Sequence, residues 1–397
     1  MDHCLHGFPR AVRTPVVGQA LAIVLAAIIS IGHADPKTIK SALFYASSGA
    51  CLGEIGCNGA GVSTTWQRVA ECNGISGYRT PDGEFMELLD KLIANIGQCI
   101  VGKDQEIRQV VAALLARGHI LIEDVPGVGK TMLARSLARS IDARFCRIQF
   151  TPDLLPSDIT GVSVFNQKEQ TFEFRAGPVF TQILLADELN RATPRTQSAL
   201  LECMGERQVT VDGATRPMDS LFFVIATQNP IEQHGVYNLP EAQLDRFLMK
   251  IEIGYPALDE EMTIVTAQEQ VHPIERLQAV VSVTDLLRAQ EAIKRVYVDA
   301  SITEYITRLV AATRRHELLL LGASPRASLA FFRLAQAWSA IQGRDFVDPD
   351  TIKLLARPIF RHRIILTPQA RLAGTTPDQI VAQVLERVPV PVKPYGH

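Results

Sequence analysis

The segment Asp124–Thr131 combines the residue types that bind a triphosphate, and it reads Asp-Val-Pro-Gly-Val-Gly-Lys-Thr. Glycines allow the backbone to approach phosphates closely, and the free N–H groups at the start of a following helix bind anions. The ammonium of Lys130 can reach the β- and γ-phosphates, while the hydroxyl of Thr131 can ligate Mg²⁺. We therefore predict a nucleotide site formed by Pro126, Gly127, Val128, Gly129, Lys130 and Thr131.

A second candidate for phosphate chemistry is the acidic pair Asp187–Glu188, which ends the apolar run Gln182–Ala186. At the carboxyl end of a parallel strand, both carboxylates would face the same crevice as the phosphate loop. Asp187 is predicted to hold Mg²⁺ together with Thr131, and Glu188 to polarise the attacking water. Paired acids also cap helices, and 190–193 does begin a helical pattern. The phosphate loop upstream favours the catalytic interpretation.

A third polar group follows the apolar run Leu221–Ala226, which continues into Thr227-Gln228-Asn229-Pro230. A polar side chain at a strand tip beside the acidic pair can position water against the γ-phosphate, and we predict that Asn229 does so. Taken alone this signal is weak, because Asn-Pro is an ordinary turn dipeptide.

The elements around the phosphate loop support its assignment. His119–Glu123 reads as a short buried strand, and an amphipathic helix follows the loop to about Ile141. A strand, a glycine-rich loop and a helix in this order form the context of a phosphate-binding loop. One position departs from the generic pattern, since Asp124 stands where glycine is usual. If the backbone there needs a positive φ, aspartate is among the better tolerated residues.

Apolar periodicity predicts the remaining organisation. Alternating residues around a polar turn predict a hairpin within 162–174, and a second hairpin turns at Asp212-Gly213. After Pro256 the pattern is helical to the end of the chain. The predicted helices are Phe85–Ile96, about Asp104 to Ala116, Thr284–Val296, Ile302–Thr313, Arg326–Ile341 and Thr376–Arg387.

Several linked motifs together resemble the MoxR family of AAA+ ATPases. They are Val101-Gly102, Glu123–Thr131, Leu185–Ala192, Gln197–Glu202, Ala226–Pro230 and Glu241–Phe247. The resemblance extends from about residue 86 to the C-terminus. It implies an α/β P-loop core over 86–253, with a parallel sheet flanked by helices, and a smaller all-helical lid over 254–397 that closes over the nucleotide.

The same resemblance assigns roles to three further residues. It implies that Asn229 is sensor 1 and that Arg246 is the arginine finger that reaches a neighbouring subunit's nucleotide. Arg326, in Gly-Ala-Ser-Pro-Arg, resembles sensor 2 of the lid. From the residues alone, Arg246 would more simply be a solvated charge near Asp245, and Arg326 a first-turn helix residue without a ligand. An arginine finger is typically worth about 10³–10⁵ in rate.

The resemblance further implies ATP and Mg²⁺ as cofactors and a ring, expected to be a hexamer. The expected activity is ATP hydrolysis in a chaperone-like role, in which partner protein complexes are remodelled, matured or supplied with metal. A protein with a von Willebrand factor A domain is the expected partner, beside a client complex. A magnesium-chelatase-like motor subunit shares nearly all these motifs and remains an alternative.

Composition weighs against two other classes. Lys and Arg total 40 and Asp and Glu total 42, which gives a net charge of −2. A nucleic-acid-dependent P-loop ATPase is expected to carry a basic stripe, so no nucleic-acid partner is expected, although this charge leaves a local patch open. A GTPase needs an Asn-Lys-x-Asp segment, and no asparagine in this chain precedes a lysine.

Residues 1–85 differ from the rest of the chain. No charged residue lies between Arg13 and Asp35, and 46–80 is rich in Gly, Ser and Cys without sustained patterning. The apolar segment 14–34 fits a membrane anchor or a signal peptide. A third interpretation is an over-extended translation start, with the natural chain beginning at Met86. We expect a cytoplasmic protein, or an inner-membrane-anchored one if 14–34 is a transmembrane helix.

Overall fold

The computed structural model describes residues 41–45, 51–58, 61–65, 83–230, 235–267 and 272–391. Its contacts divide the chain into two units, Met1–Gly77 and Tyr78–His397. The apolar segment 14–34 lies outside the described residues. Among the residues that are described, no helix is both long enough and apolar enough to cross a membrane.

The first unit contains a three-stranded antiparallel sheet that the sequence did not predict. Its strands are β1 (Ser41–Tyr45), β2 (Cys51–Asn58) and β3 (Gly61–Thr65), in the order β1-β2-β3. Strand prediction depends on alternating apolar and polar residues. Small and polar residues dominate β2 and β3, so the alternation is missing.

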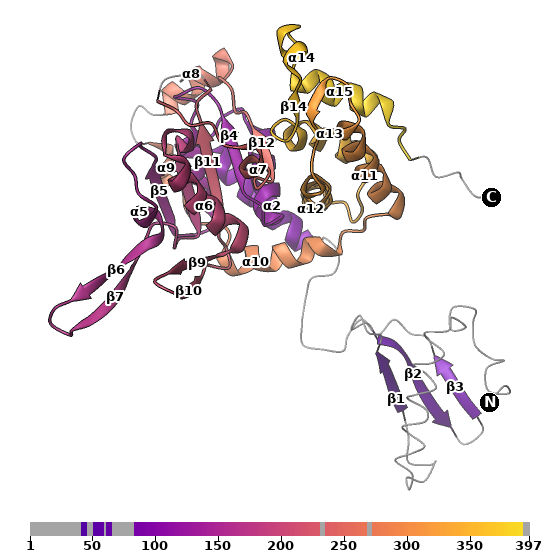
Figure 1. Cartoon of the computed structure of the whole chain (residues 1–397). Helices are drawn as coiled ribbons and strands as arrows, with labels where there is room; N and C mark the ends of the chain where they lie inside the picture. Colours follow the sequence, from indigo (N-terminus) through magenta and orange to yellow (C-terminus); the bar gives the residue numbers. More distant parts are fainter. Residues whose placement is uncertain are drawn as a thin grey trace. The chain divides into compact units, whose positions relative to one another are not determined.

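A five-stranded parallel sheet organises the second unit (Figure 1). Its order is β12-β4-β11-β8-β5, so β4, the first of the five strands along the chain, lies between the last two, β11 and β12. Glu123 pairs with Gln228, and Gln149 pairs with Asp187, which aligns the carboxyl ends of four strands at one edge. The strands are β4 (Ile120–Glu123), β5 (Phe145–Gln149), β8 (Ile183–Asp187), β11 (Phe223–Gln228) and β12 (Met249–Ile251).

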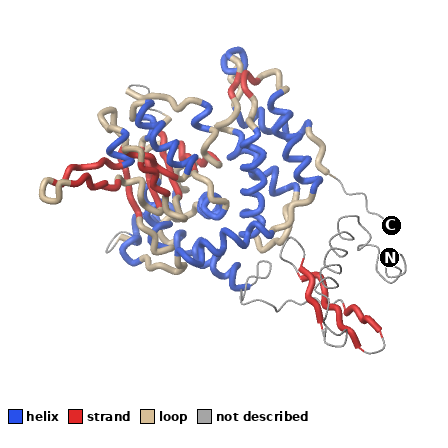
Figure 2. The backbone as a smooth tube through the Cα atoms, turned by 60° about the horizontal axis from the view of Figure 1, so that its bottom comes forward, coloured by secondary structure: helices blue, strands red, loops and turns tan. Residues whose placement is uncertain are grey.

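Helices cover both faces of this sheet (Figure 2), because its strands carry buried apolar side chains on each face. One face packs with α2 (Gly83–Gly97), α3 (Asp104–Leu115) and α4 (Lys130–Ser140). The other face packs with α6 (Pro194–Glu206). The buried strand residues of the first face include Ile120, Ile122, Ile183, Leu185, Phe223 and Ile225, and those of the second include Leu121, Leu184, Ala186, Val224 and Ala226.

Both predicted hairpins are present. The first, β6 (Gly161–Asn166) with β7 (Thr171–Ala176), follows the short helix α5 (Pro156–Thr160) and extends away from the sheet in Figures 1 and 2. The second pairs β9 (Gln208–Val211) with β10 (Ala214–Pro217). Its turn residues Asp212 and Gly213 both have positive φ, as a tight hairpin turn requires.

The region after the sheet is helical, as predicted, and also contains a ribbon of two short strands, β13 (Leu319–Leu321) and β14 (Ile365–Leu366). The long helix α12 (Pro325–Ile341) lies at the centre of this helical region and packs against α13 (Pro349–Phe360) and against α3 of the sheet layer. The other helices of this region are α8 (Leu258–Ala267), α9 (Pro273–Arg276), α10 (Val283–Ala292), the 3₁₀ turn Ile293–Arg295, α11 (Ala300–Arg314), α14 (Pro368–Leu372) and α15 (Pro377–Arg387), while the short helix α7 (Glu241–Leu244) precedes β12.

Candidate active site

The phosphate-loop residues lie between the carboxyl end of β4 and the first turn of α4. Gly127 and Gly129 have φ values of 89° and 87°, a backbone conformation that favours glycine. Gly129 is the N-cap of α4, so Lys130 and Thr131 form its first turn beside free N–H groups. The Lys130 ammonium donates to the Asp124 carbonyl oxygen at 2.6 Å. The loop therefore has the backbone geometry that surrounds a phosphate.

Asp124 has a different role from the one its sequence position suggested. It is absent from the described residues with positive φ, so tolerance of that conformation does not explain it. Its buried carboxylate instead accepts hydrogen bonds from the N–H groups of Val125 (2.8 Å), Ile253 (2.8 Å) and Gly254 (2.6 Å). Aspartate thus ties the start of the phosphate loop to the segment that follows β12.

The metal candidate Asp187 ends β8 and is 8% exposed. Its Oδ1 accepts a hydrogen bond from the Thr227 hydroxyl at 2.6 Å. Its Oδ2 accepts two from the Arg147 guanidinium, at 2.6 Å and 3.0 Å. Carboxylate and hydroxyl oxygens are the ligand types that Mg²⁺ takes beside substrate phosphates, so Asp187 and Thr131 fit this ion.

Glu188 has a left-handed backbone conformation with φ of 56°, and two neighbouring residues contact its side chain. Its carboxylate accepts a hydrogen bond from the Gln149 side chain at 2.6 Å and pairs with Arg191 at 3.1 Å. The Oε1 of Gln149 in turn accepts from Arg147 at 2.8 Å. Two residues of β5 therefore connect the two acids.

The sequence patterns had given no functional role to Arg147 or Gln149. The available signal was a charged residue inside the strand Phe145–Gln149, and it became interpretable only once β5 was placed beside β8. Thr227 lay within the predicted strand tip but received no role. Asn229 is buried just beyond β11, whose Gln228 carbonyl accepts from the Asp124 N–H at 3.2 Å. The structure therefore brings the Asn229 segment next to the phosphate loop.

Arg246 and Arg326 lie elsewhere, at the opposite end of the sheet. Both line a cavity of about 880 Å³ that also contacts Gly118 and His119, which precede the amino end of β4. The phosphate loop follows the carboxyl end of that strand. The structure therefore places Arg326, the predicted sensor 2, beside Arg246, the predicted arginine finger.

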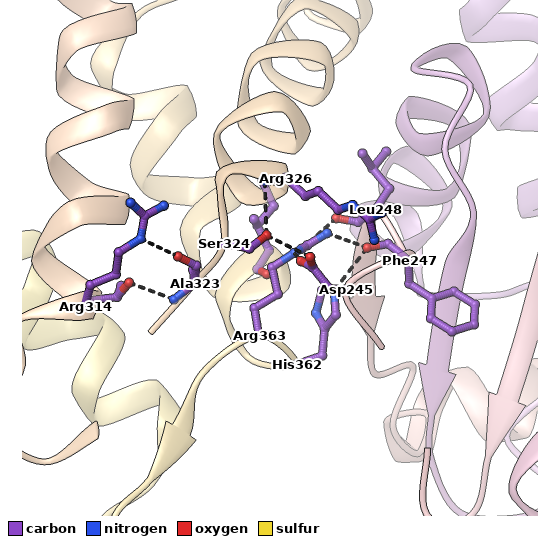
Figure 3. A network of polar contacts seen from close by, with 11 residues as sticks. Asp245, Phe247, Leu248, Arg314, Ala323, Ser324, Arg326, His362 and Arg363 are labelled. Carbon is purple, nitrogen blue, oxygen red and sulfur yellow. Dashed lines mark hydrogen bonds and ion pairs between the residues drawn. The ribbon is translucent and has the colours of Figure 1, made fainter. Parts of the chain in front are cut away.

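A polar network lies next to both arginines in the chain, and Figure 3 shows the part of it around Asp245, Ser324 and Arg363. The Asp245 carboxylate accepts hydrogen bonds from the Ser324 hydroxyl (2.7 Å) and from Arg363 (2.9 Å). Ser324 also caps α12 by accepting from the Arg326 N–H at 3.1 Å. Asp245 thus adjoins Arg246 in the chain and reaches Arg326 through the helix cap.

Arg363 contributes the most buried charge of this network. Burial lowers the pKa of Arg363 to about 10, although the attraction of Asp245 opposes this shift. The guanidinium also donates to the carbonyl oxygens of Leu248 (3.1 Å) and Ile359 (2.7 Å). Satisfied donors and a paired charge are what a buried guanidinium requires. The network therefore joins the sheet layer to the helical region.

The strand order, the phosphate loop at the carboxyl end of β4, the acids at the end of β8 and the helical region define a AAA+ nucleotide-binding fold. Residues 119–249 match the model of the ATPase family associated with various cellular activities, and 311–384 match the AAA lid domain.

Similar proteins of known sequence identify the family within this class. Chaperone MoxR1 of Mycobacterium tuberculosis is 40% identical over 345 residues, which cover 80% of this chain and 91% of that protein. Protein YeaC of Bacillus subtilis is 51% identical over 306 residues, 77% of this chain and 96% of that protein. A crystal structure of a Cytophaga hutchinsonii protein shares 40% identity and a TM-score of 0.73, and covers 78% of this chain and 96% of that chain. The chain belongs to the MoxR family of AAA+ ATPases.

Proposed function

We propose that this protein hydrolyses ATP in a ring whose active sites are each shared by two neighbouring protomers. The supporting observation is that the phosphate loop and the pair Arg246 and Arg326 lie at opposite ends of the strand β4. An arginine stabilises a transferring phosphoryl group only by contacting it. In a head-to-tail ring, which we expect to be a hexamer, each phosphate loop faces the arginines of the next protomer.

Within such a site each candidate residue has one task. The loop N–H groups and Lys130 bind the phosphates, and Thr131 and Asp187 hold Mg²⁺, which neutralises phosphate charge when bound. Glu188 polarises the attacking water once it separates from Gln149. Asn229 orients that water against the γ-phosphate. Arg246 and Arg326 come from the neighbour and stabilise the developing charge.

The test mixes two inactive variants. Lys130→Ala removes nucleotide binding at the loop, and Arg246→Ala removes the contribution to the neighbour. Neither variant alone should turn over ATP, whereas an equimolar mixture should regain a fraction of wild-type activity, because some interfaces combine an intact loop with an intact Arg246. A mixture that stays inactive, although both variants assemble, would contradict a shared site.

We further propose a chaperone-like role in which ATP turnover remodels or matures a partner protein complex, including metal insertion. The name of the relative Chaperone MoxR1 supports the general role. Glu188→Gln should bind ATP without hydrolysing it and so hold the client. Recovery of a von Willebrand factor A protein with this trap supports the partner; recovery of a chelatase complex, or turnover stimulated by nucleic acid, favours the corresponding alternative.

Two proposals concern the organisation of the chain. We place a nucleotide-binding domain at 86–253 and a lid domain at 254–397, which is supported by family matches on either side of residue 254. We also propose a cytoplasmic location, where ATP is available. N-terminal sequencing of the native protein tests whether residues 1–85 belong to it, and membrane fractionation tests an anchor at 14–34.

A further inference from the structure

The cavity beside the amino end of β4 is unusually basic. It has a volume of about 880 Å³, and two acids, Glu206 and Asp245, are among the described residues that line it. Guanidinium groups reach it from the segment after α3, from the end of α6, from the segment after α7, from α12 and from the turn after α13. The lining arginines are Arg117, Arg207, Arg246, Arg326, Arg333 and Arg363.

Part of this charge is neutralised within the protein, and part is not. Arg363 pairs with Asp245, and Arg117 pairs with Glu291 at 2.8 Å. Within the described residues, the Arg207 side chain donates to one acceptor, the neutral Arg117 carbonyl oxygen, at 3.1 Å. In the part of the chain that the structure describes, the side chain of Arg333 has no hydrogen bond or ion pair. The cavity therefore keeps an excess of positive charge.

The backbone keeps the arginines of this cavity close together despite the repulsion between their charges. Arg207 ends α6 with φ of 51°, a conformation that non-glycine residues rarely adopt. Burial, together with the charges of Arg117 and Arg333, lowers the pKa of Arg207. Gly205 also leaves room for the neighbouring guanidinium, since a Cβ there would lie 2.5 Å from Nη1 of Arg246. These features fit a site prepared for an anion.

We propose that Arg207 and Arg333 are polyphosphate-binding residues, and that this cavity receives the triphosphate of the neighbouring protomer's nucleotide alongside Arg246 and Arg326. The inference rests on the proposed shared site and adds two residues to it. Arginine forks bind phosphate oxygens in pairs, and a triphosphate carries enough negative charge for several of them. Arg326 and Arg333 lie seven residues apart on α12, so their side chains project from the same side of the helix.

The rival occupant is an acidic peptide of another protein. An extended acidic segment needs cations spread along a track, whereas Arg207, Arg246 and Arg333 converge on one hollow from three elements. Convergence favours a compact polyanion, and a triphosphate is one.

The first experiment measures binding of inorganic tripolyphosphate by calorimetry to the full-length Lys130→Ala protein, which lacks a working phosphate loop. Arg207→Gln and Arg333→Gln, each added to this background, should weaken binding by about tenfold. The matched control Arg308→Gln removes an equally charged residue of α11, which pairs with Glu304 outside the cavity, and should bind as the parent does. Equal affinity in all four proteins would overturn the proposal.

An oligoglutamate peptide of the same charge is the competing probe and should bind more weakly than tripolyphosphate; tighter binding of the peptide would overturn the proposal. A second measurement separates this inference from the shared site. Arg333→Gln with an intact loop should lose turnover and regain it when mixed with Lys130→Ala. If Arg333→Gln turns over normally while the mixture of Arg246→Ala and Lys130→Ala recovers activity, the site is shared and the inference is wrong.

Discussion

The carboxylate of Asp124 accepts a hydrogen bond at 2.6 Å from the backbone N–H of Gly254, which lies 130 residues later in the chain. The same oxygen accepts from Ile253 at 2.8 Å. One side chain thereby links the beginning of the phosphate loop to the end of the sheet layer, where the chain leaves β12 for the helical region. A substitution of Asp124 therefore removes a contact that joins the two segments.

Asp124→Ala should therefore lower both stability and nucleotide affinity. Three backbone N–H groups lose their acceptor, and buried donors without partners cost about 1–3 kcal/mol each, so we expect a loss of roughly 2–4 kcal/mol after solvent reaches some of them. Urea unfolding and ATP titration measure the two effects. The control Asp90→Ala removes an exposed carboxylate of α2 and should leave both unchanged. Wild-type stability in Asp124→Ala would contradict this role.

Arg147→Gln should lower the Mg²⁺ concentration required for half-maximal ATP binding. The guanidinium now contacts the Asp187 oxygen at 2.6 Å and competes with a metal ion for that carboxylate. Removing this competing cation should strengthen Mg²⁺ binding severalfold. Titration of Mg²⁺ at fixed ATP, followed by nucleotide fluorescence, measures the shift. A higher Mg²⁺ requirement would show instead that Arg147 supports metal binding.

Ser324→Ala should reduce ATP turnover more than its effect on stability explains. The substitution removes the bond to Asp245 and the cap of α12, in which Ser324 holds the backbone N–H of Arg326, so the first turn that carries Arg326 should loosen. Loss of a helix cap costs about 1 kcal/mol. Thr376→Ala is the matched control, because it removes the cap of α15 but contacts no arginine of the cavity. Equal turnover in the two variants would exclude a positioning role for Ser324.

The stability of the protein should fall on mild acidification, partly through His119. Burial, with the nearby charge of Arg207, lowers the pKa of His119 to about 4. In the unfolded chain this residue binds a proton near pH 6.5, whereas in the native protein it does so only near pH 4. The unfolded state therefore binds more protons between these two pH values, and the free energy of unfolding decreases as the pH falls through this window. The contribution reaches about 3 kcal/mol at pH 4.

His119→Gln tests this prediction. The ring accepts from the Val224 N–H at 3.0 Å and lies 3.3 Å from the Met204 carbonyl oxygen, and an amide can reproduce both contacts. The free energy of unfolding of the variant should decline less steeply between pH 6.5 and 4. Burial also places the pKa of His362 well below its ordinary value, so some of the decline should remain. Parallel curves would assign the acid sensitivity to other groups.

Local features of the chain were sufficient to locate the candidate residues of the phosphate site. The loop Asp124–Thr131 is one continuous segment, and the acids and Asn229 follow apolar runs whose length and composition mark them as strands. Both hairpins were also predictable, because a turn and its flanking alternation are close in sequence. By contrast, the small and polar residues of β2 and β3 carry no such alternation.

The sequence by itself determined the family, and it placed the candidate residues for a triphosphate, a metal ion and a water molecule at the ends of predictable strands. Only the tertiary structure decided which partners those residues have. Arg147 reaches Asp187 because β5 lies beside β8, and Asp124 reaches Gly254 because β12 lies beside β4. The cavity of Arg207, Arg246 and Arg333 likewise exists only after three distant segments pack together. Contacts of this kind depend on strand order and helix packing, which leave no local pattern in the chain.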